Sequence, residues 1–546
     1  MFDYFRFILL ATSAPILVNL AFRHPYSWLH VMLVAICFAV SSSIGSMTYA
    51  MFIQPCFFSS LRNLPTATQK PIWTRLFKEP TSRDLARFHK QASTSQILRY
   101  FGVLNSERLL LTDPKDIKQV MDSEAYEFGR SYLIRRLLSP VLGKNSLVVT
   151  DGPDHMRCRK IENARLLVED VTTNSCGTDG QTLGLDNAID VLKWLEKAAF
   201  RLVFIAFFGS IAIEDHSLIQ DLLQEFRDAF AITSGSSAQA EMAWETVLPS
   251  HLFFTLFPVN DTRKTKRSMR GIKGYCRRRI AQRKSQYTPA SRALPDKNIL
   301  DTAIKSEDLT DEEILGLCTT FLATGYKTVS VALAWAIYHL STRPGVQALL
   351  RTEVRASFPA PDQTGAPLLT SDMLQNMPVL AAVCNETLRF SPLVALTYRE
   401  ALTDTLLSGS NQVIPQGTIL AISPWVIQRS PIYWRSGDST SESLSHTALP
   451  SPSTWDMTRW LSDKKGGAKM QCSFMPFGRG PQCCIAEAFA RDEMMILLAA
   501  LVGRFDFSFH SSGHNHDPRP EELRVSFGVV AEPVMLMVRA QPVSGW

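Results

Sequence analysis

Apolar residues dominate the N-terminal part of the chain. No Asp, Glu, Lys or Arg occurs from Trp28 to Ile53, a stretch of 26 residues. A helix of that length, with a rise of about 1.5 Å per residue, spans roughly 39 Å, more than the roughly 30 Å hydrocarbon core of a bilayer. The pattern predicts a membrane span. The earlier apolar stretch 7–22 is shorter and contains Pro15 and Asn19, so it fits a second span, a re-entrant segment or a signal-like region.

We therefore expect residues 1–58 to form an N-terminal transmembrane anchor with one or two spans. Cleavage as a signal peptide is the alternative, but the longer apolar stretch follows at once and would remain as an anchor. Basic residues follow at Arg62, Lys70, Arg75 and Lys78, and only Glu79 opposes them. Because positive charge is typical of the cytosolic side of a span, the rest of the chain is expected in the cytosol.

Polar and apolar patterns after the anchor predict mostly helices. Prolines and small polar residues at 59–71 predict a linker. The stretch 107–121 has the pattern of a short strand, a turn at Asp113 and a helix start. Long helical patterns cover 188–209 and 310–340, and the second opens with Thr310 and Glu313 at the spacing of a capping box. We expect a catalytic domain over 72–546 that is mainly α with a small β region.

Composition narrows the functional classes. The chain has 546 residues, 46% hydrophobic and 20% charged, so it can bury a large core. A net charge of +6 over this length does not indicate a nucleic-acid partner, and we expect none. Ten cysteines are too thinly scattered for a disulfide-stapled secreted domain, which predicts mostly free thiols in a reducing compartment.

One strongly basic segment needs a separate explanation. Residues 263–284 include eleven Lys or Arg and no acidic residue. Nucleic-acid binding is one interpretation of such a run. We prefer a solvated helix face near anionic lipid headgroups, because the apolar segment 252–259 directly precedes it. The lipid bilayer is thus an expected partner.

Two adjacent cysteines precede a predicted helix in "FGRGPQCCIAEAFA" (477–490). A metal-bound thiolate in a tight loop needs small residues, a sharp turn and an apolar shield over the sulfur. Counting back from Cys484 places Phe477 seven residues before it and Gly480 four before it, and a helix N-terminus that stabilises a thiolate follows. The same count from Cys483 places Pro476 and Arg479 there and fails.

The pattern F-x-x-G-x-x-x-C-x-A resembles the haem-thiolate signature of the cytochrome P450 superfamily. The resemblance implies the cytochrome P450 fold, haem b (iron protoporphyrin IX) as cofactor, and Cys484 as the axial metal ligand, with Phe477 and Gly480 beside it. Two positions depart from the pattern. Gln482 stands where the family usually has a basic residue facing a haem propionate, and Ala486 where it usually has Gly. Other basic residues must replace the charge that Gln482 lacks.

Further cofactor-binding residues follow from the same resemblance. Glu386 and Arg389 lie at i, i+3 and can pair on one helix face. Arg459 is similar to the arginine of the family's P-E-R-F segment, although Thr458 replaces the usual Glu, and would complete a buried triad that braces the haem side of the core. Ordinary surface pairing is the alternative for Glu386 and Arg389.

Three basic residues resemble the family's propionate-binding groups. They are Arg399, and His155 and Arg159 at i, i+4 on a predicted helix. Each also fits an ordinary solvated basic residue. Together they would supply the positive charge that is missing at Gln482.

The stretch 321–335 resembles the family's oxygen-binding helix, and there Gly325 and Thr328 fit the pattern as catalytic residues. Glycine inside a helix costs roughly 1 kcal/mol against Ala, so Gly325 implies the close approach of a ligand. Lys327 stands where the family has an acid. Either Lys327 points away and a water chain through Thr328 delivers protons, or the oxygen chemistry is altered, with slow turnover, rearrangement or dehydration.

The resemblance implies a monooxygenase that inserts one oxygen atom from O2 into a lipophilic small molecule. Electrons would come from NADPH through a membrane-bound reductase, at the endoplasmic reticulum membrane with the catalytic domain in the cytosol. The anchor and the segment "SERLLLTDP" look most like fungal members, many of which oxidise terpenoid, polyketide or alkaloid intermediates of specialised metabolism. Two alternatives stay open: a haem-thiolate isomerase or dehydratase, favoured by Lys327, and a non-catalytic haem-binding sensor, favoured by Gln482 and Lys327 together.

Overall fold

The computed structural model describes residues 48–545 and isolated positions between 33 and 45, with gaps at 77–78, 92–95, 144–145, 164–187, 210–215, 231–259, 287–297, 306–308, 359–372, 375, 436–448 and 511–522. The stretch 7–22 and most of 28–53, where membrane spans are expected, lie outside the described residues. The apolar segment 252–259 lies outside them too.

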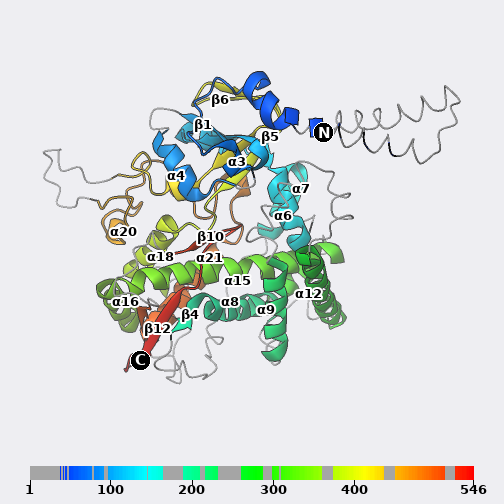
Figure 1. Cartoon of the computed structure of the whole chain (residues 1–546). Coiled ribbons are helices and arrows are strands. Elements are labelled where there is room, and N and C mark those ends of the chain that lie inside the picture. Colours follow the sequence, from blue (N-terminus) through cyan, green and yellow to red (C-terminus); the bar gives the residue numbers. More distant parts are fainter. Residues whose placement is uncertain are drawn as a thin grey trace, which may run out of the picture.

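Helix α15 (Asp311–Ser341) crosses the middle of the molecule (Figure 1). Its capping box is confirmed: the amide of Glu313 donates to Thr310 Oγ1 at 3.3 Å, and the amide of Thr310 donates to Glu313 Oε2 at 2.9 Å. Among the described residues, α15 is the one helix long and apolar enough to cross a bilayer, and most of it is buried by its neighbours. It is therefore the core helix of this domain.

Helices surround α15 on several sides. Those that pack against it include α8 (Val191–Phe208), α12 (Asn260–Ser285), α16 (Pro344–Ser357), α18 (Pro378–Phe390) and α21 (Glu487–Arg504). The predicted helical stretch 188–209 corresponds to α8 after a two-residue strand, β4 (Ile189–Asp190). Phe200 of α8 meets Tyr326 of α15 edge to face, with ring centroids 5.3 Å apart. Helix α9 (His216–Phe230) packs beside α12.

A five-stranded sheet covers the other side of the molecule, above α15 in Figure 1. Its order is β1 (Ile97–Phe101), β2 (Glu107–Leu111), β8 (Ile419–Ile422), β5 (Thr397–Ala401) and β3 (Phe128–Arg130). All of its pairs are antiparallel except β2 with β8. The predicted strand, turn and helix at 107–121 are confirmed, because β2 leads to Asp113, which caps α5 (Pro114–Lys118).

Smaller sheets complete the domain. Strands β4, β12 (Met537–Pro542) and β9 (Phe505–Phe509) form one of them, and β6 (Thr405–Leu407) pairs with β7 (Gln412–Ile414). Strands β10 (Val525–Phe527) and β11 (Ala531–Pro533) form a hairpin. The remaining helical elements are η1 (Tyr49–Phe58), α3 (Ile72–Arg75), α4 (Ser82–Gln91), η2 (Val103–Asn105), η3 (Gln119–Ser123), α6 (Tyr132–Leu142), α7 (Gly152–Asn163), α14 (Ile299–Lys305), α19 (Pro424–Ile427), α20 (Thr458–Ser462) and η6 (Gly480–Gln482).

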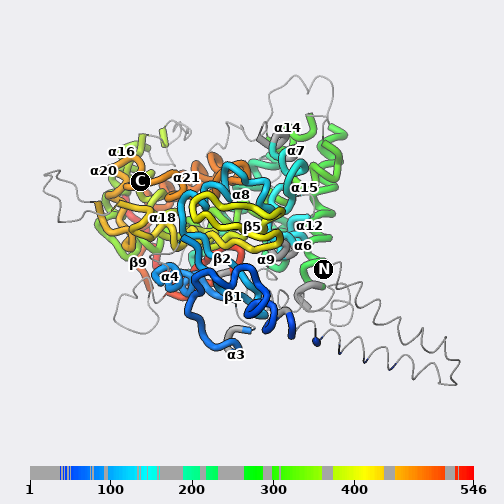
Figure 2. The backbone as a smooth tube through the Cα atoms, turned by 90° about the horizontal axis from the view of Figure 1, so that it is seen from above, coloured from blue at the N-terminus to red at the C-terminus, as the bar shows by residue number. Residues whose placement is uncertain are grey.

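The mainly helical fold with a small β region is thus confirmed for the part of the chain that is described. The segment 59–71, expected to be a linker, packs against the sheet. Leu61 and Ala67 are buried, and the amide of Ala67 donates to Arg99 O of β1 at 2.8 Å. Figure 2 shows this segment beside β1 and β2, so it belongs to the folded body.

Candidate active site

Glycines fix the shape of the loop that carries the paired cysteines. Gly478 and Gly480 have φ angles of 77° and 70°, which residues with a Cβ disfavour. A Cβ at Gly480 would also lie 2.1 Å from the carbonyl oxygen of Met121 in η3. A side chain at position 480 therefore requires the loop to move, which explains the glycine there.

The two cysteines have different surroundings. Arg159 of α7 binds Cys483 twice: Nη1 donates to Cys483 O at 2.5 Å, and Nη2 lies 3.1 Å from Cys483 Sγ. Cys484 is exposed, and its amide donates to Phe477 O at 2.7 Å. The loop still crowds the Cys484 thiol enough that burial raises its pKa, although the amide of Ala486 opposes this shift. Cys484 is thus the more exposed of the two cysteines, and the sulfur of Cys483 is the one that contacts Arg159.

Phe477 anchors the start of the same loop on α21. The guanidinium of Arg491 lies 4.8 Å from the Phe477 ring centroid, within the range of a cation–π contact. Arg491 is itself held by Glu487, whose Oε1 accepts from Arg491 Nε at 2.9 Å. The aromatic ring, the glycine turn and the first turn of α21 therefore form one unit around Cys484.

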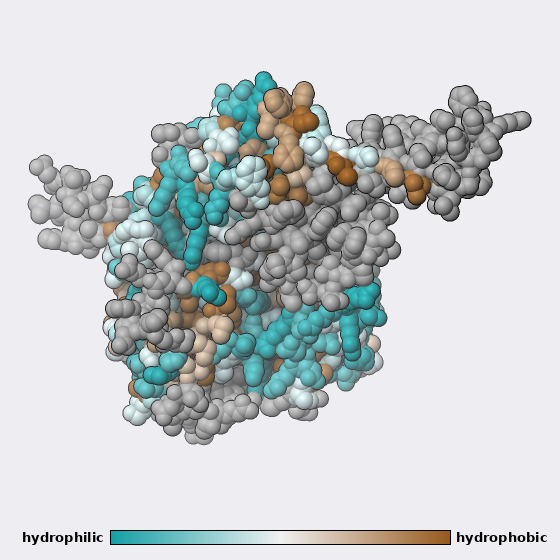
Figure 3. All heavy atoms as spheres, viewed as in Figure 1, coloured by the Kyte–Doolittle hydropathy of each residue, from teal (hydrophilic) through white to brown (hydrophobic). Residues whose placement is uncertain are grey.

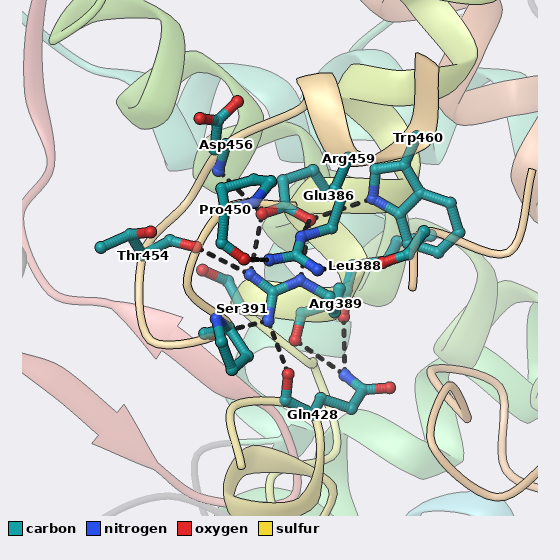
Figure 4. Close-up of polar contacts among 12 residues, drawn as sticks. Glu386, Leu388, Arg389, Ser391, Gln428, Pro450, Thr454, Asp456, Arg459 and Trp460 are labelled. Carbon is teal, nitrogen blue, oxygen red and sulfur yellow. Dashed lines mark hydrogen bonds and ion pairs between the residues drawn. The ribbon is translucent and has the colours of Figure 1, made fainter. Parts of the chain in front are cut away.

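The expected triad is assembled and fully buried (Figure 4). Arg389 binds Glu386 bidentately, with both nitrogen to oxygen distances at 2.7 Å. Arg459 Nε lies 3.5 Å from Glu386 Oε2, and burial followed by repulsion from Arg389 lowers the pKa of Arg459 to about 10. The Nη atoms of the two arginines donate to backbone carbonyls of Gln428, Pro450, Ser451, Pro452, Thr454 and Gly466. The triad thus holds the chain around 450–466 in place.

Gln428, which the sequence did not single out, links this triad to the cysteine loop. It is fully buried, and its Nε2 donates to Leu388 O at 3.0 Å and to Arg389 O at 2.9 Å. Its Oε1 accepts from the amide of Met475 at 2.9 Å. Met475 lies two residues before Phe477. Gln428 therefore fixes the start of the cysteine loop against the end of α18.

Basic side chains gather beside the loop. His155 and Arg399 are buried, and Arg159 is partly buried. Burial and the charges of three arginines lower the pKa of His155 to about 4, so the imidazole is neutral. Burial and the charge of Arg130 lower the pKa of Arg399 to about 9. Arg130 of β3 joins this cluster because its backbone is in register with Arg399 of β5. It is a functional candidate that sequence reasoning missed.

The cationic cluster, defined as Arg130, Arg159, Arg399 and His155, has an excess of positive charge. Within the described part of the chain, the acidic group at its centre is Asp151, which accepts from the amide of Arg130 at 2.9 Å. Asp151 is also shared with Arg135, 3.4 Å away, so it cannot neutralise the three guanidinium groups of the cluster. Nε of Arg130 and of Arg399, Nε2 of His155 and Oε1 of Gln482 are buried without a hydrogen-bond partner in the described residues. The cluster has the charge and the free N–H groups to bind an anionic group, whereas Oε1 of Gln482 can only accept a hydrogen bond.

Gly325, Lys327 and Thr328 lie on the same turn of α15 but contact different neighbours. Thr328 Oγ1 donates to Thr324 O at 2.8 Å, and Thr324 Oγ1 donates to Thr320 O at 2.8 Å. A Cβ at Gly325 would lie 2.9 Å from Val203 Cγ2 of α8. The crossing of α8 thus gives this glycine a packing reason, besides the ligand approach that we expected. The ammonium of Lys327 contacts carboxylates of α8 and β11.

Comparison with known proteins gives this site its context. The family model described as Cytochrome P450 matches residues 65–538, most of the chain. The chain belongs to the cytochrome P450 family. Among its relatives, cytochrome P450 monooxygenase sphH of Aspergillus fumigatus is 28% identical over 537 residues, with 92% of each chain covered. Cytochrome P450 monooxygenase buaD of Petromyces alliaceus is 29% identical over 547 residues, with 93% of each chain covered.

As a cytochrome P450, the chain is an oxidoreductase that uses haem b and electrons from NADPH through a reductase. The geometry fits that cofactor. Cys484 offers an accessible sulfur at the N-terminus of α21. The cationic cluster lies beside the same loop through the contacts of Arg159 with Cys483, and its surplus of positive charge suits the two propionates of haem b. Arg130 contributes to this positive charge, whereas Gln482 carries none.

Proposed function

We propose that this cytochrome P450 inserts oxygen from O2 into a lipophilic small molecule, an intermediate of terpenoid, polyketide or alkaloid specialised metabolism. The observation that carries the reaction class is the accessible thiol of Cys484 beside the cationic cluster. The named relatives, which are monooxygenases of fungi, support the reaction class, and the substrate class is proposed from the resemblance to fungal members. Proteins of one fold can act on many different substrates, so the substrate is assigned by turnover with candidate compounds.

In this proposal Cys484 holds the iron, and Arg130, Arg159, Arg399 and His155 hold the propionates. Bound haem would supply the activation of dioxygen, which no side chain provides. In this proposal Glu386, Arg389 and Arg459 act on the cofactor through the chain around it, because their groups bind one another and backbone carbonyls. They keep the surrounding chain rigid, which a preorganised site requires.

Proton handling falls to the hydroxyl groups of α15 in this proposal. Thr320, Thr324 and Thr328 repeat every four residues and therefore share one face of the helix. Thr320 Oγ1 also donates to Ser146 Oγ at 3.0 Å. Water molecules along this hydroxyl row would carry protons to Thr328. This matches the interpretation in which Lys327 points away, because its ammonium is bound to carboxylates on other elements.

The contacts of Lys327 and the position of Arg130 weaken the two alternative functions. An isomerase or dehydratase was favoured by Lys327 as a cation at the reacting centre, but this cation is neutralised by Glu196 and Glu532. A sensor without turnover was favoured by the missing charge at Gln482, but Arg130 lies in register with Arg399 and restores it. Insertion of oxygen is therefore the function that the geometry supports best.

We also propose attachment to the endoplasmic reticulum membrane, with α12 facing anionic headgroups. Arg263, Lys266, Arg267, Arg270 and Arg278 are exposed on α12. Successive helical residues are about 100° apart, so these five lie within roughly 120° of one another around the helix. Figure 3 shows hydrophilic residues gathered where Figure 1 places α12. Phe57 and Phe58 of η1 are 65% and 68% exposed, as expected for aromatic side chains at a membrane interface.

The test uses membranes that contain the chain, a reductase, NADPH and isotope-labelled dioxygen, supplied with candidate lipophilic substrates. One labelled oxygen atom in the product, with NADPH consumed in proportion, is the expected result. Product without label would support the isomerase or dehydratase, and a substrate-dependent spectral change without product would support the sensor. Recovery of a chain lacking residues 1–58 in the soluble fraction, with full-length chain in the membrane fraction, is expected for the anchor.

A further inference from the structure

Lys327 belongs to a partly buried row of charges that connects four elements. Its Nζ lies 2.9 Å from Glu196 Oε1 of α8 and also contacts Glu532 of β11. Glu196 binds a second cation, because its Oε2 accepts from Arg227 Nε of α9 at 2.7 Å. The order Arg227, Glu196, Lys327, Glu532 alternates positive and negative charge. The row is therefore neutral in total, although each group is removed from most of the solvent.

Burial makes this row sensitive to the loss of any member. The side chains of Glu196, Lys327 and Glu532 are 6%, 20% and 19% exposed. Burial alone lowers the pKa of Lys327, but Glu196 and Glu532 outweigh it and the pKa is raised, so Lys327 stays charged. Removing one partner of a buried ion pair is strongly destabilising, because the other charge is left without compensation.

The hairpin β10–β11 has three points of attachment near Glu532. The amide of Ala531 donates to Leu393 O at 2.7 Å, and Trp335 Nε1 of α15 donates to Ala531 O at 3.0 Å. Lys327 binds the next residue, Glu532. Lys327 and Trp335 are eight residues apart on α15, or about 12 Å along its axis. The hairpin is thus attached to α15 at two separate turns.

The tip of the hairpin packs against two hydrophobic clusters of the core. Val529 packs against the cluster that contains Phe321 and Tyr326 of α15, and Phe489 of α21 packs against the same cluster. Val530 packs against the cluster that contains Val329 and Val331. The tip therefore packs against both hydrophobic clusters to which α15 contributes, and β11 contacts α15 directly.

We propose that Lys327 is a positioning residue that clamps hairpin β10–β11 onto α15 through Glu532 and so fixes one wall of the substrate pocket. The inference rests on the proposed function, because the pocket is the one beside Thr328 and Cys484. It explains why a cation at the family's acid position is compatible with the fold. The ammonium of Lys327 holds the hairpin through Glu532, and Glu196 still neutralises this ammonium when the hairpin moves.

The first test measures the hairpin directly and needs no turnover. Hydrogen exchange at the amides of 525–533 is followed in the haem-loaded protein for wild type, Lys327→Met, Lys327→Arg and Glu532→Gln. We expect exchange about tenfold faster in Lys327→Met and Glu532→Gln, as for local opening that has become easier by about 1.4 kcal/mol. Lys327→Arg should restore protection. Lys464→Met, at an exposed lysine, is the matched control.

The second test measures the pocket wall with two azoles that bind the haem iron. Imidazole is small and should bind all variants equally, whereas a bulky triaryl imidazole should change its affinity about fivefold or more in Lys327→Met and Glu532→Gln. If Lys327→Met does not fold, Glu532→Gln still decides, because it leaves the pair of Lys327 and Glu196 intact. Unchanged exchange and an unchanged affinity ratio in Glu532→Gln would overturn the clamp. Failure of every variant and of wild type to bind haem would instead overturn the proposed function.

Discussion

Replacing Gln428 by Met tests whether the triad supports the cysteine loop through a single buried amide. Methionine has a similar length and no amide, so it keeps the packing and removes three hydrogen bonds. Those bonds join Gln428 to Leu388 O, Arg389 O and the amide of Met475. The backbone groups left behind are enclosed by the protein and gain no water in exchange.

The magnitude follows from the number of bonds. At about 1 kcal/mol for each buried hydrogen bond, the substitution costs about 3 kcal/mol. Unfolding entropy is about 2.1 cal/mol/K per residue, so roughly 500 folded residues give about 1 kcal/mol/K. The unfolding midpoint of Gln428→Met is therefore expected to fall by about 3 °C. Haem should also be lost faster, because Met475 precedes Phe477 in the loop that holds Cys484.

The assay is thermal unfolding of the haem-loaded protein followed by circular dichroism, with haem release followed at the Soret band. Gln416→Met is the matched control, since Gln416 is exposed. A midpoint for Gln428→Met within about 1 °C of the control, with equal haem release, would refute the connection. A lower midpoint with unchanged haem release would show that Gln428 stabilises the fold without supporting the loop.

Three further predictions concern the loop, the cationic cluster and the charge row. Gly480→Ala should abolish the thiolate-type carbon monoxide band, because its Cβ would meet Met121 O. A Cβ at Gly478 would meet no atom closer than 3.6 Å, so Gly478→Ala should keep part of the band. Equal bands in the two variants would contradict the steric argument. Arg130→Leu should speed haem transfer to apomyoglobin about tenfold, since a charge-assisted contact is lost, and a wild-type rate would remove Arg130 from the cluster. Because the pKa of Lys327 is raised above 10.5, its contribution to stability is complete below that pH and is lost only as pH rises through the higher folded value. Hairpin exchange corrected for intrinsic rates should thus be constant from about pH 6 to 9, and a transition in that window in wild type but not in Lys327→Met would contradict it.

Local patterns in the sequence predicted the parts of the site that depend on short spacing. The loop around Cys484 was found because its glycines, aromatic residue and helix start lie within a few residues of the sulfur. Glu386 and Arg389 were found because i, i+3 neighbours meet on one helix face. The capping box of α15 has the same local character. In each case the chain itself sets the distance between the groups.

Residues brought together by distant segments could not be predicted in this way. Arg130 joins the cluster only because β3 and β5 pair in a register that places it opposite Arg399. Gln428 meets Met475 through tertiary packing of segments that no spacing rule relates. The partners of Lys327 come from α8 and β11, before and far after it in the chain. Sequence reasoning identified Lys327 as a departure but left open where its side chain points.

Cys484 as the ligand of the haem iron is the central element of the proposed function. The direct measurement is the carbon monoxide difference spectrum of reduced membranes containing wild type, Cys483→Ser or Cys484→Ser. A thiolate-type Soret band in wild type and Cys483→Ser that is lost in Cys484→Ser is the predicted result. A band that survives in Cys484→Ser, or haem-containing wild type without that band, would contradict the account.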